Sequence, residues 1–120
     1  MFDHLGLTTA NVEASIRFYT AALEPLGFQL TSRDDSGAGF GDAKSTSLWL
    51  YGGGKGKARG VHVAVVAKDR ASVDRFYKAG IEAGGKDNGR PGVREDYSPQ
   101  YYAAFMLDPD GNNVEAVCLK

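Results

Sequence analysis

The chain has 120 residues, with 14 Lys and Arg against 15 Asp and Glu, two His, one Cys and 16 Gly. One domain is expected at this length, and the 42% hydrophobic share is typical of a globular protein and excludes a disordered one. The net charge of -1 provides no basic surface for nucleic acid or an anionic membrane. A single cysteine, Cys118, excludes an internal disulfide, and neither a targeting segment nor an apolar run of membrane-spanning length is visible, so we expect a cytoplasmic protein.

The sequence contains an internal repeat. An offset of 58 residues aligns the first half of each copy, and an offset of 66 residues aligns the second half, with about eight extra residues in the second copy near residues 85–100. The matches are His4 with His62, Arg17-Phe18-Tyr19 with Arg75-Phe76-Tyr77, Asp42 with Asp108, and Trp49 with Glu115. We therefore predict two copies, residues 1–51 and 61–120, joined by a flexible Gly-rich linker at residues 52–60. Such a linker also favours exchange of copies between two chains, and hence a homodimer.

In the first copy, residues 2–9 alternate as a half-buried strand does, with Leu5 and Leu7 on one side. Asn11 is the expected N-cap of a helix whose apolar residues keep a 3.6-residue period until Gly27. Three short strands follow, over residues 28–31, around 39–40 and over 47–51, separated by turn sequences.

The second copy repeats this order, with a strand over 61–67, a helix after Asp69, and last strands over 101–107 and 113–119. Residues 84–100 are expected to form a loop, either a lid over a ligand or a plain surface loop. Each βαβββ copy buries little core alone. We therefore predict an α+β fold in which the first strands of the two copies pair, giving one curved mixed sheet that forms a cup, with the helices on its convex side.

Strand alternation also predicts which side chains enter the cup. The apolar residues of each strand face the helices, so His4, His62 and Glu115 point the other way, from three different strands. Two imidazoles and one carboxylate form the facial set that leaves coordination positions open for water and substrate. We therefore expect a divalent metal, with Zn, Ni, Mn, Co or Fe(II) all compatible with these donors.

Aromatic and basic residues complete the predicted cup. Trp49, at the repeat position of Glu115, and Tyr51 are expected to line it as an apolar wall against which a substrate stacks. Arg94 and Tyr97, in the long segment that precedes the last two strands, are expected to contact the substrate if that segment closes as a lid.

Tyrosine and glutamate are the candidate catalytic groups. Tyr101 and Tyr102 are adjacent on one strand, so one of them faces the cup and the other faces the helices, and alternation alone leaves open which. The tyrosine in the cup is a candidate acid or hydrogen-bond donor beside Glu115, and its alternative is a core or rim aromatic.

The sequence resembles the vicinal oxygen chelate superfamily, which includes glyoxalase I, fosfomycin-resistance proteins, extradiol dioxygenases and bleomycin-resistance proteins. The segments that carry the resemblance span nearly all of the chain and are residues 3–7, 15–19, 60–64 and 108–115. The resemblance implies metal ligands at His4, His62 and Glu115. It also implies a small-molecule substrate whose vicinal oxygens are chelated by the metal, in a lyase- or isomerase-like reaction.

One departure bears on the reaction. Glyoxalase I-like members place a fourth ligand, a carboxylate, where this chain has Trp49, which neither binds metal nor moves a substrate proton. Extradiol dioxygenases use further histidines, and both His4 and His62 are already assigned to the metal, so dioxygenation is less favoured than a lyase or isomerase. The alternative is a metal-free small-molecule-binding protein of the bleomycin-resistance type, in which the two histidines are ordinary sheet residues.

Overall fold

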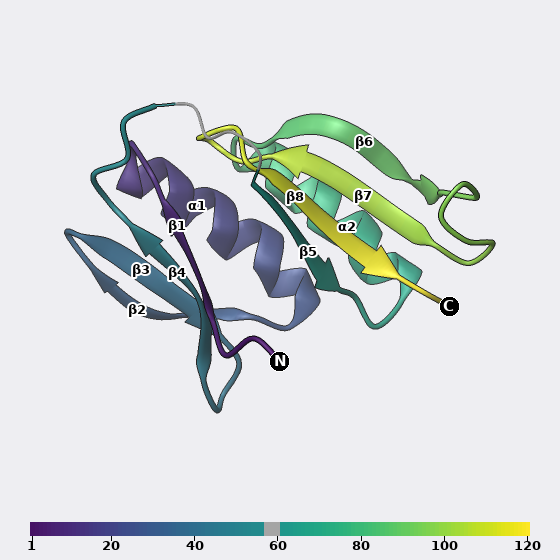
Figure 1. Ribbon diagram of the computed structural model, residues 1–120, viewed down its shortest axis with the longest axis horizontal. Helices are drawn as coiled ribbons and strands as arrows, with labels where there is room; N and C mark the ends of the chain where they lie inside the picture. Colours follow the sequence, from purple (N-terminus) through teal and green to yellow (C-terminus); the bar gives the residue numbers. More distant parts are fainter. Residues whose placement is uncertain (57–60) are drawn as a thin grey trace.

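The computed structural model describes residues 1–56 and 61–120, which form two βαβββ modules (Figure 1). Module 1 comprises β1 (Leu5–Thr8), α1 (Val12–Leu23), the 3-10 turn η1 (Glu24–Leu26), β2 (Gln29–Asp34), β3 (Gly37–Gly41) and β4 (Thr46–Tyr51). Module 2 comprises β5 (His62–Val66), α2 (Arg70–Glu82), β6 (Lys86–Val93), β7 (Tyr102–Leu107) and β8 (Asn113–Cys118). The last part of the predicted linker, residues 57–60, lies outside the described residues. No described helix is long and apolar enough to cross a membrane.

The predicted α+β fold with two βαβββ modules is confirmed, but its strands form two sheets. The strand orders are β1-β4-β3-β2 and β5-β8-β7-β6, and in each sheet the first strand runs parallel to the last while the other neighbours are antiparallel. The expected pairing of β1 with β5 does not occur within the described chain, so both remain edge strands. In the view of Figure 1, α1 lies between the two sheets, and it packs on α2.

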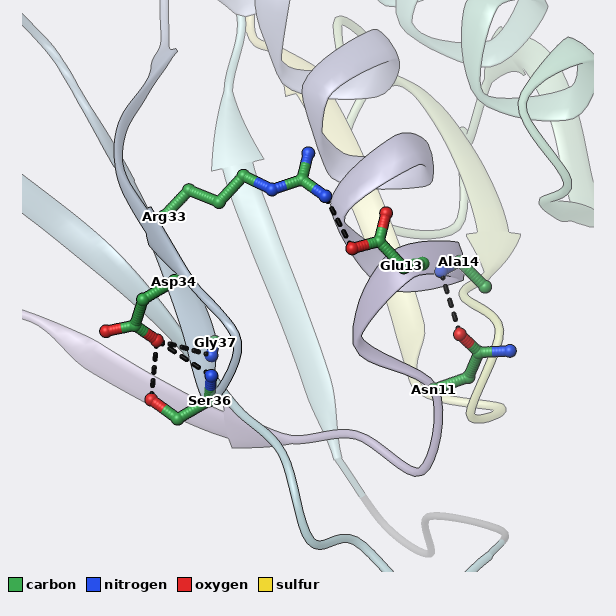
Figure 2. Close-up of polar contacts among 7 residues, drawn as sticks. All are labelled: Asn11, Glu13, Ala14, Arg33, Asp34, Ser36 and Gly37. Carbon is green, nitrogen blue, oxygen red and sulfur yellow. Dashed lines mark hydrogen bonds and ion pairs between the residues drawn. The ribbon is translucent and has the colours of Figure 1, made fainter.

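Both helices begin at the predicted N-caps. Asn11 accepts a hydrogen bond from the Ala14 amide at 3.0 Å, and Asp69 accepts one from the Ser72 amide at 2.7 Å. An ion pair between Arg33 of β2 and Glu13 in the first turn of α1 then links the helix to the edge of its sheet (Figure 2). These local contacts set the start and the direction of each helix.

The core is shared between the modules. Its largest fully buried side chains come from both helices and from the helix-facing sides of both sheets, and they include Phe18, Tyr19, Phe40, Phe76 and Met106. Gly80 allows α2 to approach β7, because a Cβ at this position would lie 2.3 Å from the Met106 Cε atom.

The predicted loop at residues 84–100 is wrong over residues 86–93. Residues Lys86–Val93 form β6, which pairs antiparallel with β7 as an edge strand. Two register shifts, around Gly89, let this Gly- and Pro-containing segment pair in spite of its composition, and Pro91 is tolerated because it lies on an edge strand. Only the short connection after Val93 remains as a loop.

The turn after β7 fastens module 2 to module 1. Asp108 accepts a hydrogen bond from the Tyr19 hydroxyl at 2.6 Å, and Asp110 accepts bonds from the Ala10 amide at 2.8 Å and the Ser15 hydroxyl at 3.2 Å. Both carboxylates are buried. Burial and the neighbouring Asp108 raise the pKa of Tyr19 well above its usual value, so its hydroxyl stays protonated as a donor.

Candidate functional site

Glu115 is a buried carboxylate on the face of β8 that points away from α2. Its neighbours Val114 and Ala116 pack in the core, as the alternation predicts, and Glu115 itself is 2% exposed. Glu115 Oε1 lies 2.9 Å from His62 Nε2, and Oε2 accepts a hydrogen bond from the Tyr101 hydroxyl. The carboxylate therefore joins two of the predicted site residues, with one oxygen turned toward each.

His62 begins β5, next to β8 in a parallel pair whose register places His62 beside Asn113 and Ala64 beside Glu115. Its Nδ1 atom lies 3.2 Å from the Asn113 carbonyl oxygen, and its ring stacks on Phe105 with centroids 6.2 Å apart and planes 20° apart. Both ring nitrogens thus have polar partners, yet the side chain is 47% exposed. The imidazole is fixed in place and still open to solvent.

The structure distinguishes the two adjacent tyrosines. Tyr101 points to Glu115, whereas the Tyr102 hydroxyl donates to Asp74 of α2 at 2.6 Å and its ring lies under Arg70, 5.0 Å from the guanidinium carbon. Tyr102 is therefore on the helix side and not part of the site. Partial burial, the hydrogen bond to Glu115 and the negative charge of that carboxylate raise the pKa of Tyr101 to about 12. At neutral pH Tyr101 is thus a hydrogen-bond donor.

His4 does not join this cluster. Its Nδ1 atom lies 2.6 Å from the carboxylate of Asp3, and its side chain is 52% exposed. In the view of Figure 1, β1 starts on the lower side of the molecule and β5 starts on the upper side. Within the described residues no group of three or more His, Cys, Asp or Glu side chains is arranged to hold a metal ion. One chain thus brings together His62 and Glu115, but not the third predicted ligand.

Module 1 presents aromatic rings where module 2 presents the carboxylate. Trp49 pairs with Gly6 of β1, just as Glu115 pairs with Ala64 of β5, so the repeat alignment of these two positions holds in three dimensions. A Cβ at Gly39 would lie 2.8 Å from the Trp49 ring, and one at Gly6 would lie 2.9 Å from the Tyr51 ring. The two rings therefore lie over glycine positions on the sheet face away from α1 and make it an apolar wall.

Phe105 is a site residue that the sequence reasoning missed. It pairs with Glu115 across β7 and β8, and it stacks on His62. The guanidinium of Arg94 lies over the same ring, 5.4 Å from its centroid, and the Tyr97 ring makes an edge-to-face contact with Tyr101 at 4.9 Å. The available signal was the alternation of side chains along a strand. Phe105 lies four residues after Tyr101 on the predicted last-but-one strand, so both side chains are expected on the same face.

The donors that do converge are chemically suited to a divalent metal. An imidazole nitrogen and a carboxylate oxygen come from adjacent strands, with the carboxylate buried and the His62 side chain 47% exposed. Asn113, two residues before Glu115 on the same strand, has a buried side-chain oxygen without a hydrogen-bond partner among the described residues. The set is incomplete in one chain, because a third charged or imidazole ligand is missing.

The sequence matches the Glyoxalase/Bleomycin resistance protein/Dioxygenase superfamily over residues 1–116, and the chain belongs to this superfamily. This confirms the predicted family. A comparison with curated proteins gives no match.

Solved structures share the fold. A glyoxalase/bleomycin resistance protein from Albidiferax ferrireducens T118 is 28% identical, with a TM-score of 0.83 over 98% of each chain. A glyoxalase-related enzyme from Fulvimarina pelagi is 16% identical, with a TM-score of 0.76 over 98% of this chain and 87% of that chain. A glyoxalase/bleomycin resistance protein/dioxygenase family enzyme from Burkholderia phytofirmans PsJN is 18% identical, with a TM-score of 0.73 over 98% of each chain. The last two likenesses concern the fold alone.

Proposed function

We propose that the protein is a divalent-metal-dependent enzyme of the lyase or isomerase type, acting on a small substrate with vicinal oxygens, and that two copies of the chain share each metal site. The observation that supports this most is the approach of His62 Nε2 to Glu115 Oε1 at 2.9 Å, on the sheet face that points away from α2. When bound, a Zn, Ni, Mn, Co or Fe(II) ion would polarise the substrate oxygens and stabilise negative charge on them.

A second copy is needed because His4 lies far from the other two donors in one chain. Both β1 and β5 are edge strands, and their sequences contain neither Lys nor Pro, the residues that commonly protect an edge. Leu5 is 39% and Val66 72% exposed, and both line an apolar groove of about 350 Å³ between the modules. In the proposed two-fold dimer, β1 of each chain pairs with β5 of the other, and this brings His4 of one chain to His62 and Glu115 of the other.

The remaining residues orient and enclose the site. Tyr101 holds its proton because its pKa is raised to about 12, and it donates that proton to Glu115 Oε2 in a hydrogen bond. This bond leaves Oε1 turned toward His62 as the ligand oxygen. Phe105 stacks on the His62 ring and supports it. In the proposed dimer, Trp49 and Tyr51 of the other chain supply the apolar wall of the site.

A second candidate function is a metal-free small-molecule-binding protein of the bleomycin-resistance type. The observation that favours it is that no group of three or more His, Cys, Asp or Glu side chains within the described residues is arranged to hold a metal ion, while Glu115 already contacts His62 and Tyr101. These contacts satisfy the buried carboxylate without a metal.

Metal titration distinguishes the two functions. Protein purified without chelator and then supplemented with Mn(II) or Zn(II) is expected to hold about one ion per chain, whereas Glu115→Gln weakens binding at least about 100-fold. Trp49→Phe is the matched control, because Trp49 holds the equivalent position of module 1, and it should bind metal normally. Less than about 0.1 equivalents in the unaltered protein would favour the binding protein.

A further inference from the structure

The guanidinium of Arg94 is held in a fixed position at the edge of the site, which we call the Arg94 seat and define by its contacts with Gly92, Arg90 and Phe105. Its Nη1 atom donates to the Gly92 carbonyl at 3.0 Å, and its Nη2 atom donates to the Arg90 carbonyl at 2.6 Å. The ring of Phe105 supports it from the other side at 5.4 Å. Arg94 is therefore positioned by backbone and ring contacts and not by a carboxylate.

Two glycines of β6 make room for this seat. A Cβ at Gly89 would lie 3.1 Å from Arg94 Nη2 and 2.9 Å from Phe105 Cδ1, and Gly89 has a φ of +148°. A Cβ at Gly92 would lie 3.2 Å from Arg94 Nη1. Larger residues at these positions would push the guanidinium off the ring, so the glycines of this strand serve the placement of Arg94.

Phe105 connects this seat to the proposed metal site. It pairs with Gly89 on one side and with Glu115 on the other, and the His62 ring stacks on it. The cation of Arg94 thus lies over the same sheet face as the His62–Glu115 pair, with one aromatic ring between them.

The charge of Arg94 is not neutralised by the described residues. The contacts found there between a basic side chain and a carboxylate are His4 with Asp3, Arg33 with Glu13, and His62 with Glu115. Two of the five guanidinium N–H groups are used by carbonyls, and the others have no acceptor among the described residues. A fixed, planar and uncompensated guanidinium is suited to bind a carboxylate.

Arg90, on the same strand, has a different environment. Its positive charge lies close enough to Tyr77 of α2 and to Asp87 to favour a lower pKa of both groups. Arg90 carries the same charge and lies on the same strand as the two glycines, but no contact of its side chain with the Phe105 ring is found among the described residues, and it therefore provides a matched control.

We propose that Arg94 anchors a carboxylate on the ligand, so that the substrate is a small organic acid whose carboxylate binds Arg94 while its vicinal oxygens face His62 and Glu115. This inference rests on the proposed function, because it names the substrate class of that same site. It also predicts that Gly89 and Gly92 contribute to the preference for carboxylate ligands, because they leave room for the guanidinium.

The test compares two chelating probes that differ by one carboxylate, catechol and 3,4-dihydroxybenzoate, by calorimetric titration of the Mn(II)-loaded protein at about 0.1 M salt. We expect 3,4-dihydroxybenzoate to bind about tenfold more tightly than catechol in the unaltered protein, beyond the difference measured with free Mn(II). Arg94→Gln should abolish this preference, measured as the ratio of the two affinities within the variant, and Arg90→Gln should retain it.

Three results would overturn the inference: no preference in the unaltered protein, a preference that survives Arg94→Gln, or one lost equally in Arg90→Gln. If neither probe binds, the proposed metal chemistry fails. Ligand binding by the metal-free protein then tests whether Arg94 binds a carboxylate. In that case benzoate should bind more tightly than benzyl alcohol and lose its advantage in Arg94→Gln. Equal binding of those two compounds would reject the carboxylate anchor as well.

Discussion

The two modules follow the same backbone path but carry different chemistry. Asp42 and Asp108 each close the turn before the last strand of their module by accepting two backbone amides, from Lys44 and Ser45 in module 1 and from Asp110 and Asn112 in module 2. Asp42 is exposed, whereas Asp108 is buried and also receives the Tyr19 hydroxyl. The duplication therefore preserves the residue that shapes the turn, and module 2 uses it in addition to join the modules.

The sheet faces away from the helices differ in the same way. At equivalent positions module 1 has Trp49 over a glycine and module 2 has Glu115 between His62 and Tyr101. A site with an aromatic wall on one module and polar donors on the other is asymmetric, although the fold that carries it is symmetric. Matched substitutions in the two modules can test how far this asymmetry extends.

The largest expected effect concerns the two turn aspartates. Asp108→Ala should lower the free energy of unfolding by about 3 kcal/mol, because it leaves the buried Tyr19 hydroxyl and the amides of the turn without their acceptor. Asp42→Ala should cost less than about 1 kcal/mol, since water replaces the lost acceptor at an exposed turn. Urea denaturation measures both, and equal losses would show that the turn of module 2 does not join the modules.

The next effect concerns the tyrosine that orients the carboxylate. Tyr101→Phe should weaken Mn(II) binding about tenfold, because Glu115 loses the donor that fixes one of its oxygens. Tyr102→Phe removes a hydroxyl from the adjacent residue on the helix side and should leave metal affinity unchanged. Calorimetric titration compares the two variants, and an equal loss in both would contradict the positioning role of Tyr101.

The smallest effect is a difference between the repeat-equivalent tyrosines Tyr19 and Tyr77 in how their contribution to the free energy of unfolding depends on pH. The pKa of Tyr19 is raised in the folded state by burial and by Asp108, so its contribution to stability is complete below its unfolded pKa and is lost as pH rises above about 10. Tyr19→Phe should therefore cost about 1 kcal/mol at neutral pH and progressively less in alkaline solution.

Tyr77→Phe is the control for this prediction. Its pKa is raised mainly by partial burial and by the hydrogen bond to Asp87, at a more open position than that of Tyr19. Chemical denaturation between neutral pH and about pH 11 should show a smaller change for Tyr77→Phe. A stability difference for Tyr19→Phe that does not vary with pH would show that ionisation of this hydroxyl is not coupled to folding.

Local patterns were sufficient to predict the repeat, the two helices with their caps, and the outward direction of His62 and Glu115. These features depend on neighbours in sequence, through alternation and capping. That β1 and β5 do not pair within the described chain could not be predicted, because pairing between the modules depends on how the two modules pack on each other, a long-range property. The same limit explains why His4 was expected near His62 within one chain.

The segment at residues 86–93 shows a different limit. Its glycines and Pro91 indicate a loop when each residue is read by its propensity. In the fold, register shifts and an edge position accommodate them, and the glycines make room for Arg94 on Phe105. The contact of Arg94 with that ring requires two strands to be aligned, which strand parity alone does not fix.

The central claim, a metal site shared between two chains, is tested most directly by mixing two inactive variants. His4→Ala and His62→Ala chains should each bind no metal at the site, because each dimer lacks one ligand in both sites. When the two are unfolded together and refolded in equal amounts, a mixed dimer regains one complete site, and about a quarter of all sites should bind Mn(II). No recovery of metal binding in the mixture, with dimers of both chains present, would contradict the shared site.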